Sequence, residues 1–321
     1  MLPVLTFKPI YKSVLWGGSR IAEFKHEKAD MENIGESWEL SPVPGHESVV
    51  DEGVFAGRTL GSLSEEFGAE LLGKRTIENF DGRFPLLIKF IDSCQDLSVQ
   101  VHPDNELAKA KHNSAGKTEM WYAVAPTPDA YLYDGFNRAM DKSSFMAAVE
   151  DKTIIDCLAK HNVRKGDVFY LPAGRVHAIG AGNFVLEIQQ ASDVTYRIYD
   201  YDRRDSNGNL RELHIKDALD AIKFDDEIPE AANVQASTGN IQTLVDCPFF
   251  KTSLLGVDGD FELKLDKNMS FTIIISTDGD VTITDPDNTT TKLPQGRTAL
   301  IPASMPFVSL SGKGKVVLVT T

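Results

Sequence analysis

The chain has 321 residues and a formal net charge of −14, with 42% hydrophobic and 25% charged residues. The length predicts two domains or one large β domain, and the composition is that of a globular protein rather than of a disordered chain. The excess of acidic residues argues against binding to nucleic acid or to acidic membranes, because phosphate-rich partners require clustered Lys and Arg.

Strand-like runs of β-branched, aromatic and aliphatic residues, bounded by Gly, Pro, Asp and Asn, dominate the chain. A predicted helix at 60–72 is followed by strands at 84–92 and 97–102, a helix at 104–112, strands at 119–125 and 130–134, helices at 142–150 and 153–161, strands at 167–171 and 184–190, and a helix at 213–223. Beyond Lys223 the predicted elements are strands at 241–245, 249–256, 261–265, 270–276, 280–284, 298–302 and 315–320. This pattern predicts a mainly β fold of sandwiches or barrels with a few short helices.

A weak internal repeat divides the chain. The spacing Gly, five residues, Pro occurs at Gly166–Pro172 and again at Gly296–Pro302, which is 130 residues later and about the size of one small β domain. The first copy is followed by His177, whereas the second has Phe307 at the matching position. The sequence therefore predicts two related β domains, at 1–225 and 226–321, with polar chemistry confined to the first and an acidic linker at 225–230.

The cysteines and the apolar segments indicate the cellular compartment of the protein. Cys94, Cys157 and Cys247 lie far apart and form no closely spaced pair, which favours a reducing compartment over a disulfide framework or a cysteine-rich zinc site. The first residues lack the basic and apolar pattern of a signal peptide, and no apolar run approaches the ~18 residues of a membrane span. We expect a cytoplasmic protein with no membrane association, and the sequence predicts no protein partner.

Polar side chains at strand positions form the first candidate site. Gln100 and His102 share one face of the predicted strand 97–102, because side chains alternate along a strand, and Lys117 and Glu119 have the same spacing. His177 follows a strand and a Pro-Ala-Gly turn. Two His and one Glu with an open position are a catalytic zinc set, and a Gln would add a weak neutral ligand. Each residue taken alone also fits a polar group that is satisfied within a β-sheet, and for a single His this is the more common case.

A second group of polar residues lies in the segment 187–204. Glu187, Asp193 and Arg197 stand in or beside an otherwise apolar strand pattern. Arg is the residue best suited to bidentate contact with a phosphate. The same residues could also form a strip of surface salt bridges.

Several segments together resemble a known family. The element from Gly166 to His177 is similar to the second cupin motif. The segments QVHPD, GKTEMWY, YLPAGRVHAI and SDVTYRIYDYDR, together with WGG and GESWELS, resemble the type I mannose-6-phosphate isomerases, most closely the short bacterial form without the large helical insertion. The matches run in the family's order from Trp16 to Arg203. Gln100-Val101-His102 stands where an ordinary cupin has His-x-His, and this replacement is also a feature of the isomerases.

The resemblance implies two cupin-type jelly-roll or barrel domains and one Zn²⁺ per chain. The zinc ligands at the matching positions are Gln100, His102, Glu119 and His177. The implied reaction interconverts D-mannose 6-phosphate and D-fructose 6-phosphate through an enediol, in which a metal stabilises the developing charge and a base carries a proton between C2 and C1.

The resemblance also implies the residues that contact the substrate. Lys117, Glu187 and Arg197 would line the site. Glu187 is our candidate for the base, at a pKa raised by an apolar cleft. Lys117 is a candidate for the acid partner or for stabilising oxyanion charge, and Arg197 would bind the phosphate. Asp193 matches an acidic position near the site. Ser98 matches a phosphate-contacting position, although a plain strand serine would fit there as well.

Two other function classes compete with the isomerase. A cupin oxygenase would use the two His and one carboxylate as a facial iron triad. A non-catalytic cupin could instead bind a sugar phosphate as a sensor. Gln100 as a fourth ligand and the cationic pair Lys117 and Arg197 favour the isomerase over the oxygenase, and the sequence shows no output domain that a sensor would need.

Overall fold

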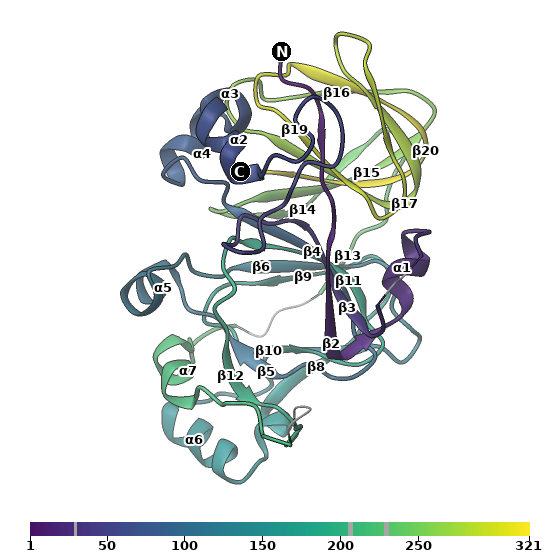
Figure 1. Cartoon of the computed structure of the whole chain (residues 1–321). Helices are drawn as coiled ribbons and strands as arrows, with labels where there is room; N and C mark the ends of the chain where they lie inside the picture. Colours follow the sequence, from purple (N-terminus) through teal and green to yellow (C-terminus); the bar gives the residue numbers. More distant parts are fainter. Residues whose placement is uncertain (29–30, 205–207, 228–230) are drawn as a thin grey trace.

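The computed structural model describes residues 1–28, 31–204, 208–227 and 231–321, and most of its regular elements are strands. The described strands form a C-terminal sheet, a seven-stranded sheet and a five-stranded sheet. Figure 1 shows them as three layers, with the C-terminal sheet at the top. The strands form open sheets packed face to face rather than closed barrels. The prediction of a mainly β fold with short helices is confirmed.

The middle sheet holds seven antiparallel strands. In spatial order they are β13 (Ala232–Asn233), β9 (Asp167–Leu171), β6 (Glu119–Ala123), β11 (Phe184–Gln190), β4 (Leu86–Asp92), β3 (Ile34–Leu40) and β2 (Ile10–Gly18). Strands β4 and β11 are buried along their whole length, so both faces of this sheet are covered.

Alternation along the strands gives the middle sheet two different faces. On one face, Leu86, Ile88 and Phe90 join a core that also contains residues of the C-terminal sheet. On the other face, Trp121 and Val185 pack in a separate core that faces the five-stranded sheet. Because the period of a strand is two, the charged residues of odd number in β4 and β11 also face the five-stranded sheet.

The lower sheet carries its helices on the outside. Its strands, in spatial order, are β12 (Tyr196–Tyr199), β5 (Val99–Val101), β10 (His177–Ile179), β7 (Tyr131–Phe136) and β8 (Leu158–Asn162). Helices α6 (Lys142–Glu150) and α7 (Ile215–Ala221) pack against one face through a third apolar core. Helix α5 (Asn105–His112) begins at the Asp104 cap, which accepts a hydrogen bond from Leu107 N, and leads from β5 towards β6.

The C-terminal sheet encloses a core of its own. Its main path is β1 (Leu5–Thr6), β19 (Thr298–Ile301), β17 (Thr272–Thr284), β20 (Phe307–Thr320), β15 (Lys251–Asp258) and β14 (Ile241–Asp246), with β16 (Phe261–Lys264) on β20 and β18 (Thr290–Leu293) on β17. Strand β1 of the N-terminal segment pairs with β19, and β13 of the C-terminal segment pairs with β9. The division at 225/226 stays a prediction, and residues 228–230 of the expected linker lie outside the described residues.

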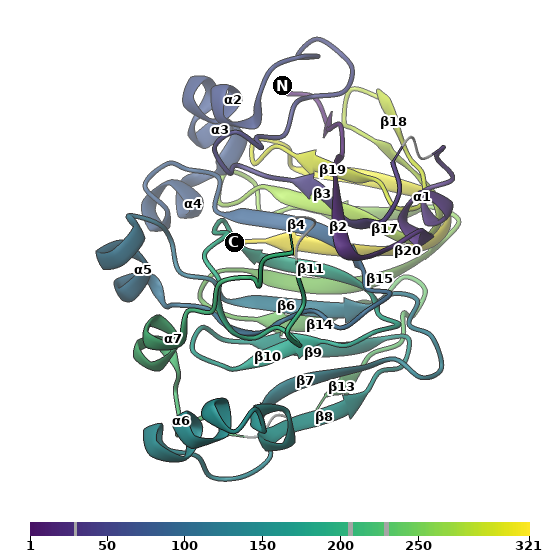
Figure 2. The ribbon, with the colours of Figure 1, turned by 60° about the horizontal axis from the view of Figure 1, so that its bottom comes forward.

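Most helices lie on one side of the sheets. Helices α2 (Leu60–Phe67), α3 (Ala69–Leu72) and α4 (Lys74–Asn79) stand on the same side as α5, α6 and α7, whereas α1 (Arg20–Phe24) lies at the opposite side, as Figure 2 shows. The expected helix 60–72 is interrupted at Gly68, whose φ of 45° cannot continue a right-handed helix.

Two sequence expectations are wrong. The helix expected at 153–161 is a short 3₁₀ turn at Ile154–Cys157 followed by β8, because residues 158–162 pair with β7. The separate strands expected at 270–276 and 280–284 are one strand, β17, with a register shift between Ser276 and Asp278 opposite β20. A bulge absorbs the irregular residues there without ending the strand.

The internal repeat corresponds to the same local structure in both halves. Gly166 and Gly296 both have positive φ, 91° and 78°, and precede β9 and β19. A Pro turn follows each strand, and the next strands then begin at His177 and Phe307. The equivalent position therefore carries an imidazole in one half and a phenyl ring in the other.

Cys94, Cys157 and Cys247 are free thiols. Over the ranges that the structure describes, no helix has the length and apolar character needed to cross a membrane.

Candidate active site

Register in the five-stranded sheet places three predicted site residues in one row. His177 of β10 lies opposite Gln100 of β5, and Gln100 lies opposite Arg197 of β12. Directly opposed residues point to the same face of a sheet. His102 follows β5 by one residue and is buried.

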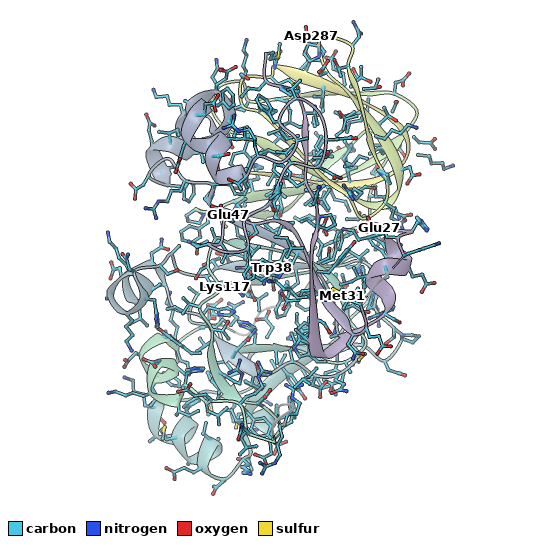
Figure 3. The ribbon with its side chains drawn as sticks, in the orientation of Figure 1. Glu27, Met31, Trp38, Glu47, Lys117 and Asp287 are labelled. Carbon is cyan, nitrogen blue, oxygen red and sulfur yellow. The ribbon has the colours of Figure 1, made fainter. Side chains whose placement is uncertain are left out.

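A matching row crosses the middle sheet. Glu187 of β11 lies between Trp121 of β6 and Lys89 of β4. Glu119 shares the face of Trp121 because it lies two residues earlier in β6, and Lys117 precedes Glu119 by the same interval. Figure 3 labels Lys117 near the centre of the molecule, at the level of the middle sheet.

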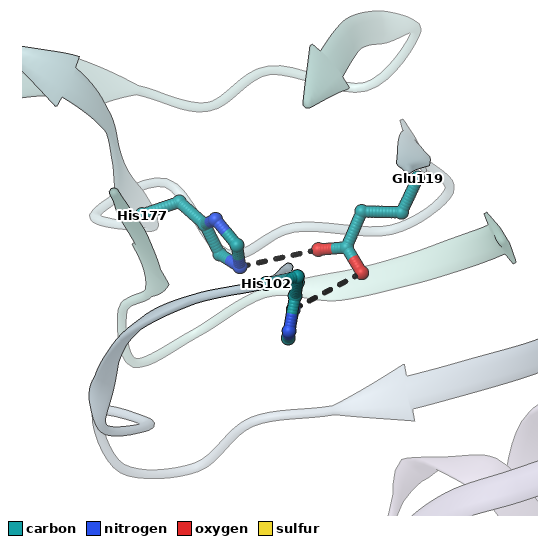
Figure 4. Close-up of side chains that lie close together, drawn as sticks. All are labelled: His102, Glu119 and His177. Atoms are coloured by element: carbon teal, nitrogen blue, oxygen red, sulfur yellow. Dashed lines mark ion pairs between the residues drawn. The ribbon is translucent and has the colours of Figure 1, made fainter. Parts of the chain in front are cut away.

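Three buried side chains form the centre of the site: His102, Glu119 and His177 (Figure 4). Their ligand atoms all lie within 4.8 Å of one another. His177 Nε2 is 3.3 Å from Glu119 Oε1, and His102 Nε2 is 3.5 Å from Glu119 Oε2. The structure thus brings together, from three separate strands or strand ends, residues that are 75 positions apart in the sequence.

The hydrogen bonds of the two imidazoles fix their tautomers. His102 Nδ1 donates to the carbonyl of Val194 at 3.0 Å, and His177 Nδ1 donates to that of Arg175 at 2.9 Å, since a carbonyl oxygen can only accept. The Nε2 lone pairs therefore face Glu119, whose Oε1 has no hydrogen-bond partner. When Glu119 is ionised, His177 Nε2 and Glu119 Oε1 are two acceptors in contact, an arrangement that a shared cation would stabilise.

Burial sets the charges of this cluster. Burial and the charge of the nearby Lys117 ammonium together lower the pKa of His177 to about 3. The pKa of His102 is lowered by the same two causes. Burial also raises the pKa of Glu119 to about 7, against the effect of Lys117. Both imidazoles are therefore neutral, which is the form that binds a metal.

Two further side chains contact the same atoms. Lys117 Nζ donates to His102 Nε2 at 2.9 Å and forms an ion pair with Glu119. The amide nitrogen of Gln100 lies 3.4 Å from His177 Nε2, and rotation of the amide exchanges its nitrogen and oxygen positions. Two imidazole nitrogens, a carboxylate and an amide are a donor set that fits a divalent cation such as Zn²⁺.

Glu187 lies in a different electrostatic environment from the one expected. Its Oε1 is 3.0 Å from Lys89 Nζ, and its Oε2 accepts a hydrogen bond of 2.8 Å from Trp121 Nε1. Burial alone would raise the pKa of Glu187, but Lys89, Lys117 and Trp121 together lower it to about 2. The expectation of a raised pKa is therefore wrong, because an apolar cleft was assumed where a buried cation stands.

Lys89 is the main residue that sequence reasoning missed. It also lies 3.9 Å from Glu36 and 5.3 Å from the centre of a Trp38 ring. The sequence contained a feature that could have identified Lys89: it interrupts an otherwise apolar run in a strand that is buried on both faces. A charged residue in such a strand requires a buried partner, and Glu187 is directly opposite.

A cavity of about 320 Å³ opens beside the cluster. It brings together six of the predicted site residues, namely Ser98, Gln100, Lys117, Glu187, Asp193 and Arg197. Polar or aromatic lining residues that were not predicted are Trp16, Glu36, Lys89, Thr195 and Arg211. Ser98 is buried within this wall, whereas Asp193 is exposed.

Comparison with known proteins identifies the family. Residues 4–128 match the model for "Phosphomannose isomerase type I, catalytic domain", and residues 240–321 match that for "Mannose-6-phosphate isomerase, cupin domain". Mannose-6-phosphate isomerase ManA of Bacillus subtilis is 39% identical over 279 residues, or 86% of each chain. The chain belongs to the type I phosphomannose isomerases. The family resemblance predicted from the sequence is confirmed.

Other relatives agree with this family. Mannose-6-phosphate isomerase of Streptococcus mutans is 34% identical over 88% of this chain and 87% of its own. The crystal structure of the mannose 6-phosphate isomerase from Bacillus subtilis superposes with a TM-score of 0.86 at 32% identity, over 98% of this chain and 99% of that one. A variant of phosphomannose isomerase from Salmonella typhimurium, at 17% identity and a TM-score of 0.78 over 99% of both chains, shares the fold. The cupin-type fold is thereby confirmed.

Proposed function

We propose that this chain interconverts D-mannose 6-phosphate and D-fructose 6-phosphate, with one Zn²⁺ held by Gln100, His102, Glu119 and His177. The pair of facing acceptors, His177 Nε2 and Glu119 Oε1 at 3.3 Å, is the observation that best supports a bound cation. The backbone carbonyls behind both imidazoles support the ligand role, because such contacts orient metal-binding His residues.

When bound there, zinc would supply Lewis-acid stabilisation for negative charge on the sugar oxygens. The nitrogen and oxygen donors suit zinc, although they do not discriminate strongly against other divalent metals. Metal analysis of the purified protein is therefore part of the test.

Glu187 is the proposed base. Its carboxylate lines the cavity and is ionised at neutral pH, so it can take a proton from C2 of the open-chain sugar and return it to C1 on the same face. Lys117, which lines the same cavity, can donate a hydrogen bond to a sugar oxygen while negative charge develops on it. Trp121 and Lys89 hold the carboxylate of Glu187 in place.

Arg197 is the proposed phosphate-binding residue. Its guanidinium lines the cavity, and binding of the phosphate there would orient the reacting end of the sugar. Ser98 is a second candidate for phosphate contact because its side chain is buried in the cavity wall. Asp193 is proposed to contact the sugar and to assist ring opening.

A coupled assay of fructose 6-phosphate formation tests the function, before and after chelation and after Zn²⁺ is added back. Activity that disappears with the metal and returns with zinc is expected. Full activity after complete removal of metal would contradict the proposal. Oxygen consumption would indicate a cupin oxygenase, and binding of mannose 6-phosphate without turnover would indicate a sensor.

We also propose a cytoplasmic location and a small sugar phosphate as the partner, with no nucleic-acid or membrane partner. Three free thiols and a net charge of −14 support this assignment. Fractionation of the producing cells would test it.

A further inference from the structure

Two guanidinium groups stand on the wall of the proposed substrate cavity. Arg197 lies on β12, and Arg211 lies in the segment that leads to α7. Sequence reasoning identified the first and missed the second, which lies beyond the segments that carry the family resemblance. A single guanidinium would be enough to attract an anion, so the presence of Arg211 beside Arg197 requires an explanation.

The backbone fastens the Arg211 segment to Arg197. His214 N donates to the carbonyl of Arg197 at 2.7 Å, and Arg197 N donates to His214 Nδ1 at 3.1 Å. The Arg197 side chain also donates from Nη1 to the carbonyl of Glu212 at 2.9 Å. These three bonds hold residues 212–214 against Arg197, which brings Arg211 to the same wall of the cavity.

Among the described residues, neither guanidinium has a carboxylate of its own: Arg197 has no ion pair, and Arg211 shares Asp200 with Arg203. Arg211 Nη1 lies 3.4 Å from Asp200 Oδ1, and the same Asp200 oxygen forms a shorter ion pair with Arg203. Arg197 has no carboxylate within ion-pair distance in the described part of the chain, and its buried Nε has no hydrogen-bond partner. A buried donor without a partner is unfavourable, so it favours a ligand that can accept.

The two like charges also affect each other. Burial lowers the pKa of Arg197, and the charge of Arg211 lowers it further. A guanidinium keeps its proton in proteins, so this repulsion persists until an anion lies near both groups. A phosphate dianion has three terminal oxygens that can accept hydrogen bonds from two guanidiniums at once.

We propose that Arg211 is a second phosphate-binding residue, which holds the substrate phosphate jointly with Arg197 and so gives the site its preference for phosphorylated sugars. This inference rests on the proposed function. Arg211 acts on the end of the sugar remote from Glu187, so its removal weakens substrate binding rather than the proton transfer. One charge-assisted hydrogen-bonded contact corresponds to a loss of about 10- to 100-fold in affinity.

Three variants of the zinc-loaded enzyme test the role of Arg211. Arg211→Gln removes the cation, Arg211→Lys keeps the charge without the planar fork, and Arg203→Gln is the matched control. Arg203 pairs with the same Asp200 but does not line the cavity. The measurements are the KM for mannose 6-phosphate, the inhibition constant of inorganic phosphate as a competitor, and calorimetric titration with inorganic phosphate.

We expect Arg211→Gln to raise the KM and the phosphate inhibition constant by about 10- to 100-fold, with kcat within about threefold of the wild type. Arg211→Lys should recover part of this loss, and Arg203→Gln should change both constants less than threefold. Equal losses in Arg211→Gln and Arg203→Gln would overturn the proposal, because the effect would then come from Asp200. An unchanged phosphate inhibition constant in Arg211→Gln would overturn it as well.

The experiments distinguish a failure of the proposed isomerase function from a failure of the proposed role of Arg211. A wild-type enzyme that does not convert mannose 6-phosphate would refute the isomerase, whereas the titration with inorganic phosphate would still compare wild type and Arg211→Gln. Loss of phosphate binding in that variant alone would support the role of Arg211 in any sugar-phosphate enzyme or sensor.

Discussion

Replacement of Lys89 by Met tests how the base is tuned. Lys89 Nζ and Glu187 Oε1 are 3.0 Å apart, and both side chains are buried. With an effective dielectric constant of about 20, two unit charges at this distance attract by roughly 5 kcal/mol, or about 4 pKa units. Removal of Lys89 should therefore raise the pKa of Glu187 from about 2 to about 6.

The expected consequence is a new dependence of activity on pH. In the wild type Glu187 stays ionised at pH 5, whereas in Lys89→Met only about a tenth of the carboxylates would be ionised there. A base must be deprotonated, so kcat/KM of the variant should fall about tenfold between pH 8 and pH 5 relative to the wild type. The substrate phosphate also titrates near pH 6, and taking the ratio of variant to wild type removes this common effect.

Lys89→Arg is the control, because it keeps a cation beside Glu187. Its ratio to the wild type should not vary with pH, whatever its absolute activity. If the ratio for Lys89→Met is also constant from pH 5 to pH 8, then Lys89 does not set the protonation of the base. A thermal unfolding curve for each variant confirms that folded protein is compared.

Other predictions test the ligands, the substrate contacts and the fold. His177→Ala should lose bound metal together with activity, and full zinc occupancy by elemental analysis would count against the ligand role. Arg197→Ala should raise KM by about 100-fold, and steady-state kinetics showing only a lower kcat would contradict a phosphate contact. Glu187→Gln should lower kcat by about 10²- to 10⁴-fold with a milder effect on KM, and near wild-type kcat would exclude it as the base. Gly279→Ala should destabilise the fold by about 2 kcal/mol, because φ there is 69° and a Cβ would collide with the carbonyl of Lys313; an unchanged Tm would contradict this.

The central cluster could be predicted from sequence because short-range rules govern it. Strand alternation puts Gln100 beside His102 and Lys117 beside Glu119, and these pairs do meet with His177. Which strands face each other depends on pairing between segments that are far apart in the sequence. Residue spacing does not predict this pairing, and the grouping of these residues with His177 came from the family resemblance. The electrostatic partner of Glu187 was missed for this reason, since Lys89 is its neighbour across a strand pair and not along the chain.

The fold was predictable where a segment's local preference agrees with its tertiary environment. Helix α6 has its expected limits because Asp141 and Ser144 form a capping box at its start. Residues 158–162 have a helical pattern but form β8, since pairing with β7 outweighs a weak local preference. The strand expected at 315–320 begins earlier, at Phe307, and Gly312 and Gly314 lie inside it, where close approach to β17 leaves no space for a Cβ.

The net charge of −14 is compatible with an anionic substrate because the excess of acidic residues lies mostly outside the segment that forms the site. Residues 85–204 carry 14 basic and 16 acidic side chains, so the segment that contains the proposed ligands and base is nearly neutral. Among the described residues, the cavity is lined by four cationic ones, Lys89, Lys117, Arg197 and Arg211, against three acidic ones, Glu36, Glu187 and Asp193. At physiological ionic strength, charges more than about 8 Å away are largely screened. A phosphate in the cavity would therefore interact with this local excess of positive charge, to which a bound divalent metal adds, rather than with the acidic surface elsewhere.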